Sequence, residues 1–249
     1  MRKKIIAGNW KMNYTLLQSQ TFIDEIQDSI NTNEVEVVIC PNFVVLSEVI
    51  DMLENTNIFV GAQNVYFEDK GAYTGEISAE MLLSVGIKYC IVGHSERRQY
   101  FKETNEEVNK KAKKLLEKDI KPIVCVGETL EQRNSNEMFN VISKQIEESL
   151  KDIETFYMQK DVVVAYEPVW AIGTGVTATS IQAEEMCRFI RETITKMYGD
   201  SIAQKVRILY GGSVKPSNTK ELLEMENIDG ALVGGASLTK DFVAIVNYQ

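Results

Sequence analysis

The chain has 249 residues, of which 36 are acidic and 27 basic, giving a formal net charge of −9. An apolar content of 44% and a charged content of 25% are ordinary for globular proteins and exclude a wholly disordered chain. A net negative protein has no general attraction for polyanions, so we expect neither nucleic acid nor a membrane surface as a partner.

The start of the chain carries no pattern typical of export. Arg2, Lys3 and Lys4 precede a short apolar run, Ile5–Ala7, whereas a signal peptide needs about 7–15 apolar residues. No run approaches the roughly 18 residues of a membrane helix. The 4 cysteines are widely spaced, as suits reduced thiols, and the single histidine excludes histidine-rich zinc sites. We therefore expect a cytoplasmic protein.

Short runs rich in β-branched residues recur along the chain. They are too continuous for half-exposed strands and suit strands covered on both faces. The runs span Ile5–Ala7, Val35–Cys40, Ile58–Val60, Tyr89–Val92, Ile123–Val126, Val162–Ala165, Val206–Tyr210 and Ala231–Val233.

Segments with helical spacing separate these runs. Apolar residues at such spacing are Ile23, Ile26 and Ile30, then Val108, Ala112 and Leu115, and further helices are expected over Val44–Glu54, Met138–Leu150, Ile181–Tyr198 and Asn218–Met225. Strands that alternate with helices indicate parallel βαβ units. Eight such units in 249 residues match a (β/α)₈ barrel, with a doubly wound open sheet as the alternative. We expect one barrel domain over residues 1–249.

Polar and potentially reactive residues follow the strands directly. In a parallel barrel the carboxyl ends of the strands carry the chemistry. Asn9 and Lys11 follow the first strand, His94 the fourth and Glu167 the sixth. Each also has a purely structural interpretation: a turn former for Asn9, a surface cation for Lys11, a structural histidine for His94 and a surface carboxylate for Glu167. Because His94 precedes a probable helix, the helix N-terminus would keep its imidazole neutral and able to donate a hydrogen bond.

Glycine pairs follow the last two strands. Gly211-Gly212-Ser213 and Gly234-Gly235 would let backbone N–H groups approach a ligand, as phosphate sites require. One pair alone would favour a plain turn, but two at neighbouring strand ends favour a phosphate site. The run 173–178 also fits the GxGxxA dinucleotide pattern. We reject that interpretation, because the glycines lie well beyond the end of the strand and the next strand does not end in an acidic residue that could bind a ribose.

Seven sequence blocks in order make the chain resemble the triosephosphate isomerase family along essentially its whole length. The blocks are Gly8–Lys11, Gly71–Glu76, Gly93–Arg98, Cys125–Glu128, Ala165–Gly175, Tyr210–Val214 and Leu232–Leu238. The resemblance implies a cofactor-free and metal-free isomerase that interconverts dihydroxyacetone phosphate and D-glyceraldehyde 3-phosphate, a reaction of glycolysis and gluconeogenesis.

The resemblance also implies roles for individual residues. Glu167 is the base that moves a proton between C1 and C2, and neutral His94 polarises the carbonyl, as in the acid–base pair already described for this enzyme. Asn9 would form hydrogen bonds with the substrate, and Lys11, oriented by Glu96, would stabilise the oxyanion. Ser95 would hold Glu167 in the open state. The phosphate would be bound by backbone groups of Gly173, Ser213, Gly234 and Gly235.

By the same resemblance, Pro168–Thr174 forms a lid with Trp170 as its apolar body. Tyr210 and Ser213 hold the closed lid, and Tyr166 and Glu128 hold Trp170 when it is open. The loop Gln63–Ala79 enters a twin subunit, with Thr74 near the neighbour's Asn9 and His94 and Met12 against the inserted loop. A homodimer is therefore expected.

Two other functions remain to be weighed. Lys11 could form a Schiff base in a phosphate-dependent aldolase, although a nearby Glu96 favours a charged lysine. The chain could instead be a non-enzymatic phosphometabolite-binding or surface interaction protein that kept the fold. The joint presence of Asn9, Lys11, His94 and Glu167 argues against the second possibility.

Overall fold

In the computed structural model, residues 2–172 and 177–248 are described. Their strands form a closed barrel in the order β1-β2-β3-β4-β5-β6-β7-β8, with every pair parallel. The barrel prediction is confirmed, and closure by β1 against β8 excludes the open sheet. The strands are β1 Lys4–Asn9, β2 Val35–Cys40, β3 Ile58–Ala62, β4 Tyr89–Val92, β5 Lys121–Val126, β6 Val163–Tyr166, β7 Arg207–Tyr210 and β8 Gly230–Val233.

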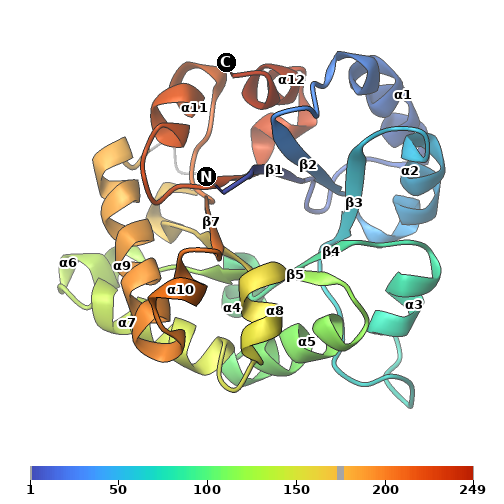
Figure 1. Cartoon of the computed structure of the whole chain (residues 1–249). Coiled ribbons are helices and arrows are strands. Elements are labelled where there is room, and N and C mark those ends of the chain that lie inside the picture. The colour runs from blue at the N-terminus through green and yellow to red at the C-terminus, as the bar shows by residue number, and fades with distance from the viewer. Residues whose placement is uncertain (1, 173–176, 249) are drawn as a thin grey trace.

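Helices surround this barrel (Figure 1). The α-helices are α1 Leu16–Ile26, α2 Leu46–Leu53, α3 Ala79–Ser84, α4 Ser95–Tyr100, α5 Asn105–Glu117, α6 Leu130–Asn134, α7 Met138–Ser149, α8 Thr155–Lys160, α9 Ser180–Tyr198, α10 Asp200–Ala203, α11 Pro216–Leu223 and α12 Asp241–Val246. Short 3₁₀ turns are η1 Gln27–Ser29, η2 Phe43–Val45, η3 Val169–Ala171 and η4 Gly235–Leu238. No helix among the described residues is long and apolar enough to cross a membrane.

The strands are buried on both faces because alternate side chains enter two different packing layers. Ile5 and Ala7 of β1 belong to the cluster inside the barrel, whereas Ile6 between them packs outward against the helices. This alternation explains the continuous apolar runs in the sequence, since each strand has one face toward the barrel interior and one toward a helix.

The element boundaries differ locally from the sequence prediction. β1 continues beyond Ala7 to Asn9, because the parallel ladder pairs Gly8 with Ile39 and Asn9 with Cys40 without needing β-branched side chains. The first helix ends at Ile26, so Ile30 lies outside it. The helices α3, α6, α8, α10 and α12 span only 4–6 residues, too few to show helical periodicity, and were not predicted.

Candidate active site

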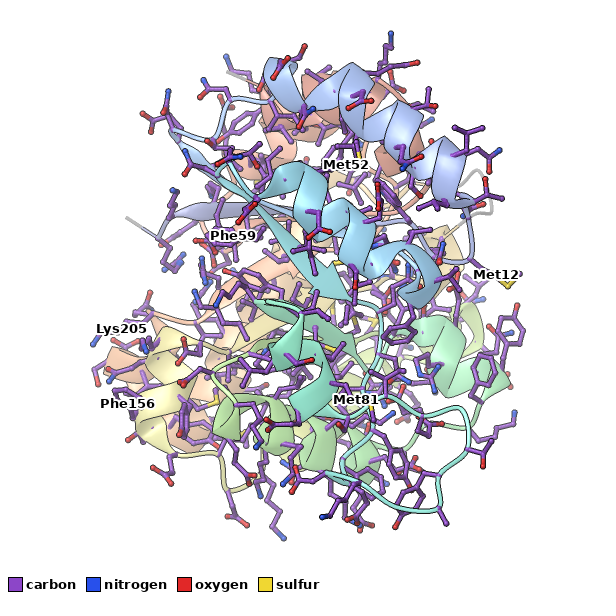
Figure 2. The ribbon with its side chains drawn as sticks, turned by 90° about the vertical axis from the view of Figure 1, so that its right-hand side faces the viewer. Met12, Met52, Phe59, Met81, Phe156 and Lys205 are labelled. Atoms are coloured by element: carbon purple, nitrogen blue, oxygen red, sulfur yellow. The ribbon has the colours of Figure 1, made fainter. Side chains whose placement is uncertain are left out.

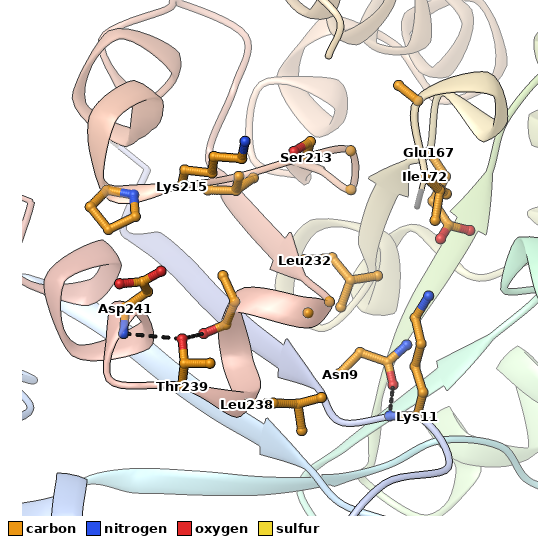
Figure 3. Close-up of a pocket in the computed structure, with 18 of the residues that line it drawn as sticks. Asn9, Lys11, Glu167, Ile172, Ser213, Lys215, Leu232, Leu238, Thr239 and Asp241 are labelled. Carbon is orange, nitrogen blue, oxygen red and sulfur yellow. Dashed lines mark hydrogen bonds between the residues drawn. The ribbon is translucent and has the colours of Figure 1, made fainter. Parts of the chain in front are cut away.

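A cavity of about 800 Å³ opens at the carboxyl ends of the strands. The predicted residues Asn9, Lys11, His94 and Glu167 all line it, together with the glycine loops after β7 and β8. Figure 3 shows Asn9 and Lys11 close together, with Glu167 and Ser213 elsewhere on the cavity wall. The structure thus brings together four predicted side chains of which Asn9 and Glu167 are 158 positions apart in sequence.

Glu167 is held at the end of β6 with its carboxylate turned toward the start of α4. The residue is only 1% exposed. Its Oε2 accepts the Ser95 backbone N–H at 2.9 Å, and its Oε1 lies 2.9 Å from Nε2 of His94 and accepts the Ser95 hydroxyl at 3.4 Å. Burial would raise the pKa of Glu167, but His94, the Ser95 N–H and Lys11 outweigh burial and lower it. The carboxylate is therefore kept ionised.

Two glycines make room for Glu167. A Cβ added at Gly211 would lie 2.9 Å from Glu167 Cγ, and one added at Gly127 would lie 1.9 Å from the Glu167 carbonyl oxygen. Neither contact is compatible with ordinary van der Waals packing. Glycine is needed at both positions because the segments that follow β5 and β7 pass very close to the buried Glu167.

His94 precedes α4 as its N-cap residue. Its Nδ1 accepts the Glu96 backbone N–H at 3.3 Å, which leaves Nε2 to face the Glu167 carboxylate. Burial lowers the pKa of His94, but the Glu167 carboxylate raises it more, so the net shift is upward in this arrangement. The helix N-terminus was predicted to keep the His94 imidazole neutral. While His94 and Glu167 are in contact, however, the Glu167 carboxylate favours the protonated ring.

Lys11 enters the cavity from a backbone conformation that few side chains adopt, with φ at +53°. Its Nζ donates to Glu96 Oε1 at 2.5 Å, and its backbone N–H donates to Asn9 Oδ1 at 3.0 Å. Gln63 donates from Nε2 to the Lys11 carbonyl at 2.8 Å. The salt bridge with Glu96 engages the nitrogen that the Schiff-base alternative would need as its nucleophile, which argues against that alternative. The sequence prediction placed Gln63 only at the start of the dimer loop and missed this contact.

The predicted phosphate-binding backbone is partly described. Ser213, Gly234 and Gly235 line the cavity, whereas Gly173 lies outside the described residues. A Cβ at Gly234 would lie 3.9 Å from Lys11 Nζ, so the ammonium is close to the loop after β8. Lys215 also lines the cavity and adds a cation that the sequence prediction did not include.

Trp170 is anchored on the carboxylate of Glu128. Glu128 Oε1 accepts the Trp170 indole N–H at 2.8 Å and the Tyr166 hydroxyl at 3.0 Å. The predicted contact of Glu128 with Trp170 is therefore present, and Tyr166 is bonded to the same carboxylate oxygen. Arg133, which was not predicted, donates to the same oxygen at 3.0 Å and lies 5.0 Å from the Trp170 ring centroid. Positions 173 and 174 of the predicted lid lie outside the described residues.

Two further predicted residues lie away from this cavity. Thr74 is exposed and does not line the cavity of its own chain, and the Met12 side chain is 96% exposed. Cys40 and Cys187 are fully buried, and burial raises the pKa of both thiols, to about 12 for Cys40, which disfavours the thiolate form. Within the described ranges, no group of three His, Cys, Asp or Glu side chains could hold a metal ion.

Comparisons with known proteins agree along the chain. A family model described as "Triosephosphate isomerase" matches residues 4–249. The curated protein named "Triosephosphate isomerase" from Alkaliphilus metalliredigens is 55% identical over 249 residues, covering all of both chains. The protein of the same name from Clostridium tetani is 53% identical over 250 residues, covering 100% of this chain and 98% of its own. That of Caldanaerobacter subterraneus subsp. tengcongensis is 52% identical over the full length of both.

Proposed function

The chain belongs to the triosephosphate isomerase family, and we propose that its cavity interconverts dihydroxyacetone phosphate and D-glyceraldehyde 3-phosphate with Glu167 as the base. The reaction is an aldose–ketose isomerisation of glycolysis and gluconeogenesis. The observation that carries the proposal is the ionised, buried carboxylate of Glu167 beside His94 and within the same cavity as Lys11.

Proton transfer begins when Glu167 leaves Ser95 and turns toward C1 of the ketose. The carboxylate takes the C1 proton, the C–H electron pair forms the C1–C2 double bond, and the carbonyl oxygen becomes an enediolate oxygen. Through His94 the C2 oxygen gains a proton and the C1 hydroxyl gives one up. Glu167 then returns its proton to C2, the C1–C2 π electron pair forms the new C2–H bond, and the C1 oxygen becomes the carbonyl of the aldose. A positioned base typically accelerates such a step by about 10²–10⁴-fold.

His94 and Lys11 act on the oxygens while Glu167 acts on carbon. Once Glu167 has moved, the group that raises the pKa of His94 most is gone, and the Glu96 N–H at Nδ1 favours a neutral ring with its proton on Nε2. That proton is then available to the substrate carbonyl. Lys11, oriented by Glu96, stabilises the developing oxyanion, and Asn9 donates from its amide; one such donor is worth roughly 10²–10³-fold.

The phosphate would lie against the backbone of Ser213, Gly234 and Gly235. Gly173, also proposed as a contact, comes from the family resemblance alone. The ammonium of Lys11 near Gly234 adds positive charge where the phosphate is expected. Closure of the lid over the substrate would exclude water and prevent loss of phosphate from the intermediate. On closure Trp170 would leave Glu128, and Tyr210 and Ser213 would hold the closed lid.

A homodimer through loop 63–79 is part of the proposal. Met12 and Val44 are 96% and 92% exposed, and Tyr73 in the loop is 42% exposed, which is unusual for large apolar side chains on a free surface. A groove of about 220 Å³ lies between the two ends of the chain's own loop 63–79 and Phe43, Arg97 and Phe101, and it would receive the partner's loop. Thr74 would then reach the partner's site.

Cytoplasmic location is proposed from the glycolytic role.

An isomerisation assay on Glu167→Asp tests the assignment of the base. Shortening the side chain withdraws the carboxylate by about 1 Å, for which we expect a loss of roughly 10²-fold or more in kcat. Glu131→Asp, at an exposed position beyond β5, serves as the control and should retain full activity. Equal turnover by the Glu167→Asp and wild-type enzymes would show that another group is the base.

A further inference from the structure

A second hollow lies at the opposite end of the barrel from the active site. It is lined by residues at or before the starts of strands, namely Arg2, Lys3, Glu36, Lys121, Lys205 and Arg207, with Lys160 from α8. Figure 2 shows this separation, with Lys205 at the left of the view and Met12, next to the catalytic Lys11, at the right. All strands are parallel, so their starts share one rim and their ends the other.

The charge of this hollow is opposite to that of the protein. Six cationic side chains and one carboxylate line it, which gives 6 − 1 = +5 in a chain of net charge −9. The cations come from four separate parts of the sequence: the start of β1, the start of β5, the end of α8, and the residues at and before the start of β7. A single charged helix face would not produce this convergence.

The acidic groups near the hollow are already neutralised. Glu36 accepts Arg207 NH1 at 2.9 Å and the hydroxyl of Tyr89. Asp229, behind the hollow, accepts Arg2 Nε at 2.6 Å and Arg191 NH2 at 2.7 Å. These bonds hold the guanidinium groups of Arg2 and Arg207 at the edge of the hollow. The two side chains are only 20% and 13% exposed.

Three of the four lysines, in contrast, have no carboxylate partner, whereas Nζ of Lys160 lies 3.7 Å from Asp161 Oδ2. Among the described residues, Lys3, Lys121 and Lys205 form no ion pair within 4.0 Å. Lys121 Nζ reaches only the Tyr89 hydroxyl at 3.4 Å, and Lys205 Nζ donates to the Gln159 amide at 2.9 Å. Lysines left without carboxylates around a concavity produce a focused positive potential.

We propose that this hollow, defined by Arg2, Lys3, Lys121, Lys160, Lys205 and Arg207, is a binding site for a small polyanion carrying two or more linked phosphate groups. Its volume of about 620 Å³ is in the range of small-molecule sites. A ligand with linked phosphates spans cations that come from several elements, whereas one phosphate would engage only part of the set. The net charge of −9 over the whole chain disfavours a long nucleic acid, which would extend beyond the hollow.

Calorimetric titration of inorganic tripolyphosphate into the wild-type protein tests the proposal. The titration is run with saturating dihydroxyacetone phosphate, equilibrated with its isomer, so that the active site is filled. We expect one tripolyphosphate per chain, with affinity at least about tenfold weaker at 200 mM than at 20 mM salt. The triple variant Lys3→Gln/Lys121→Gln/Lys205→Gln should bind at least about tenfold more weakly and isomerise normally.

A charge-matched control separates the site from general electrostatics. Lys144→Gln/Lys151→Gln/Lys220→Gln removes three exposed cations elsewhere and should change the affinity less than twofold. If the triple pocket variant does not fold, Lys3→Gln/Lys205→Gln, at two exposed positions, gives the same comparison with a smaller loss. Absence of binding with the active site filled by substrate, or equal weakening in both triple variants, would overturn the proposal.

Discussion

Replacing Glu128 by glutamine should strongly destabilise the protein. Glu128 is completely buried, and its Oε1 accepts hydrogen bonds from Tyr166, Trp170 and Arg133 at 2.8–3.0 Å. Glutamine keeps the shape but removes the charge that balances Arg133, whose side chain is 15% exposed. Breaking a buried ion pair costs about 3–5 kcal/mol. Because Arg133 retains some contact with water, we expect the lower end, about 3 kcal/mol.

Urea unfolding at one fixed protein concentration measures this loss. A fixed concentration is needed because the apparent stability of a dimer depends on it. Glu131→Gln, three positions along and exposed, is the control and should change the free energy of unfolding by less than about 0.5 kcal/mol. A loss below about 1 kcal/mol for Glu128→Gln would refute the reasoning, since the three donors would then not depend on a charged acceptor.

Three further substitutions probe the support of the site. Gly211→Ala places a Cβ 2.9 Å from Glu167 Cγ, so kcat should fall about tenfold with KM little changed in the isomerase assay. The contacts with His94 lower the pKa of Glu167 in the folded protein. Ionised Glu167 therefore stabilises the fold at pH values above the pKa of about 4.3 that glutamate has in the unfolded chain. This stabilisation is lost as the pH falls through the lower pKa of the folded state. Urea unfolding of Glu167→Gln should therefore differ more from wild type at pH 6 than at pH 3; an equal difference would contradict this. Gln63→Leu leaves the Lys11 carbonyl without its 2.8 Å donor and should cost about 1–3 kcal/mol in urea unfolding, with a lower kcat/KM; an unchanged kcat/KM would show that Lys11 is positioned without Gln63.

The order of strands and the residues at their ends could be predicted from the sequence. Continuous β-branched runs such as Val35–Cys40 reveal strands buried on both faces, and helical spacing reveals the crossings between them. Once a parallel barrel is expected, chain order alone places Asn9, His94 and Glu167 on one rim. These are properties of local pattern and topology, which do not require atomic contacts.

Contacts between distant segments required the tertiary structure. The sequence did not show that Gln63 supports Lys11 or that Arg133 shares Glu128 with Trp170. It also did not show that cations before β1 and β7 meet around one hollow, although the positive charges themselves were visible. Such contacts depend on barrel closure and on the direction of each side chain. Neither is encoded in the local periodicity from which strands and helices were inferred.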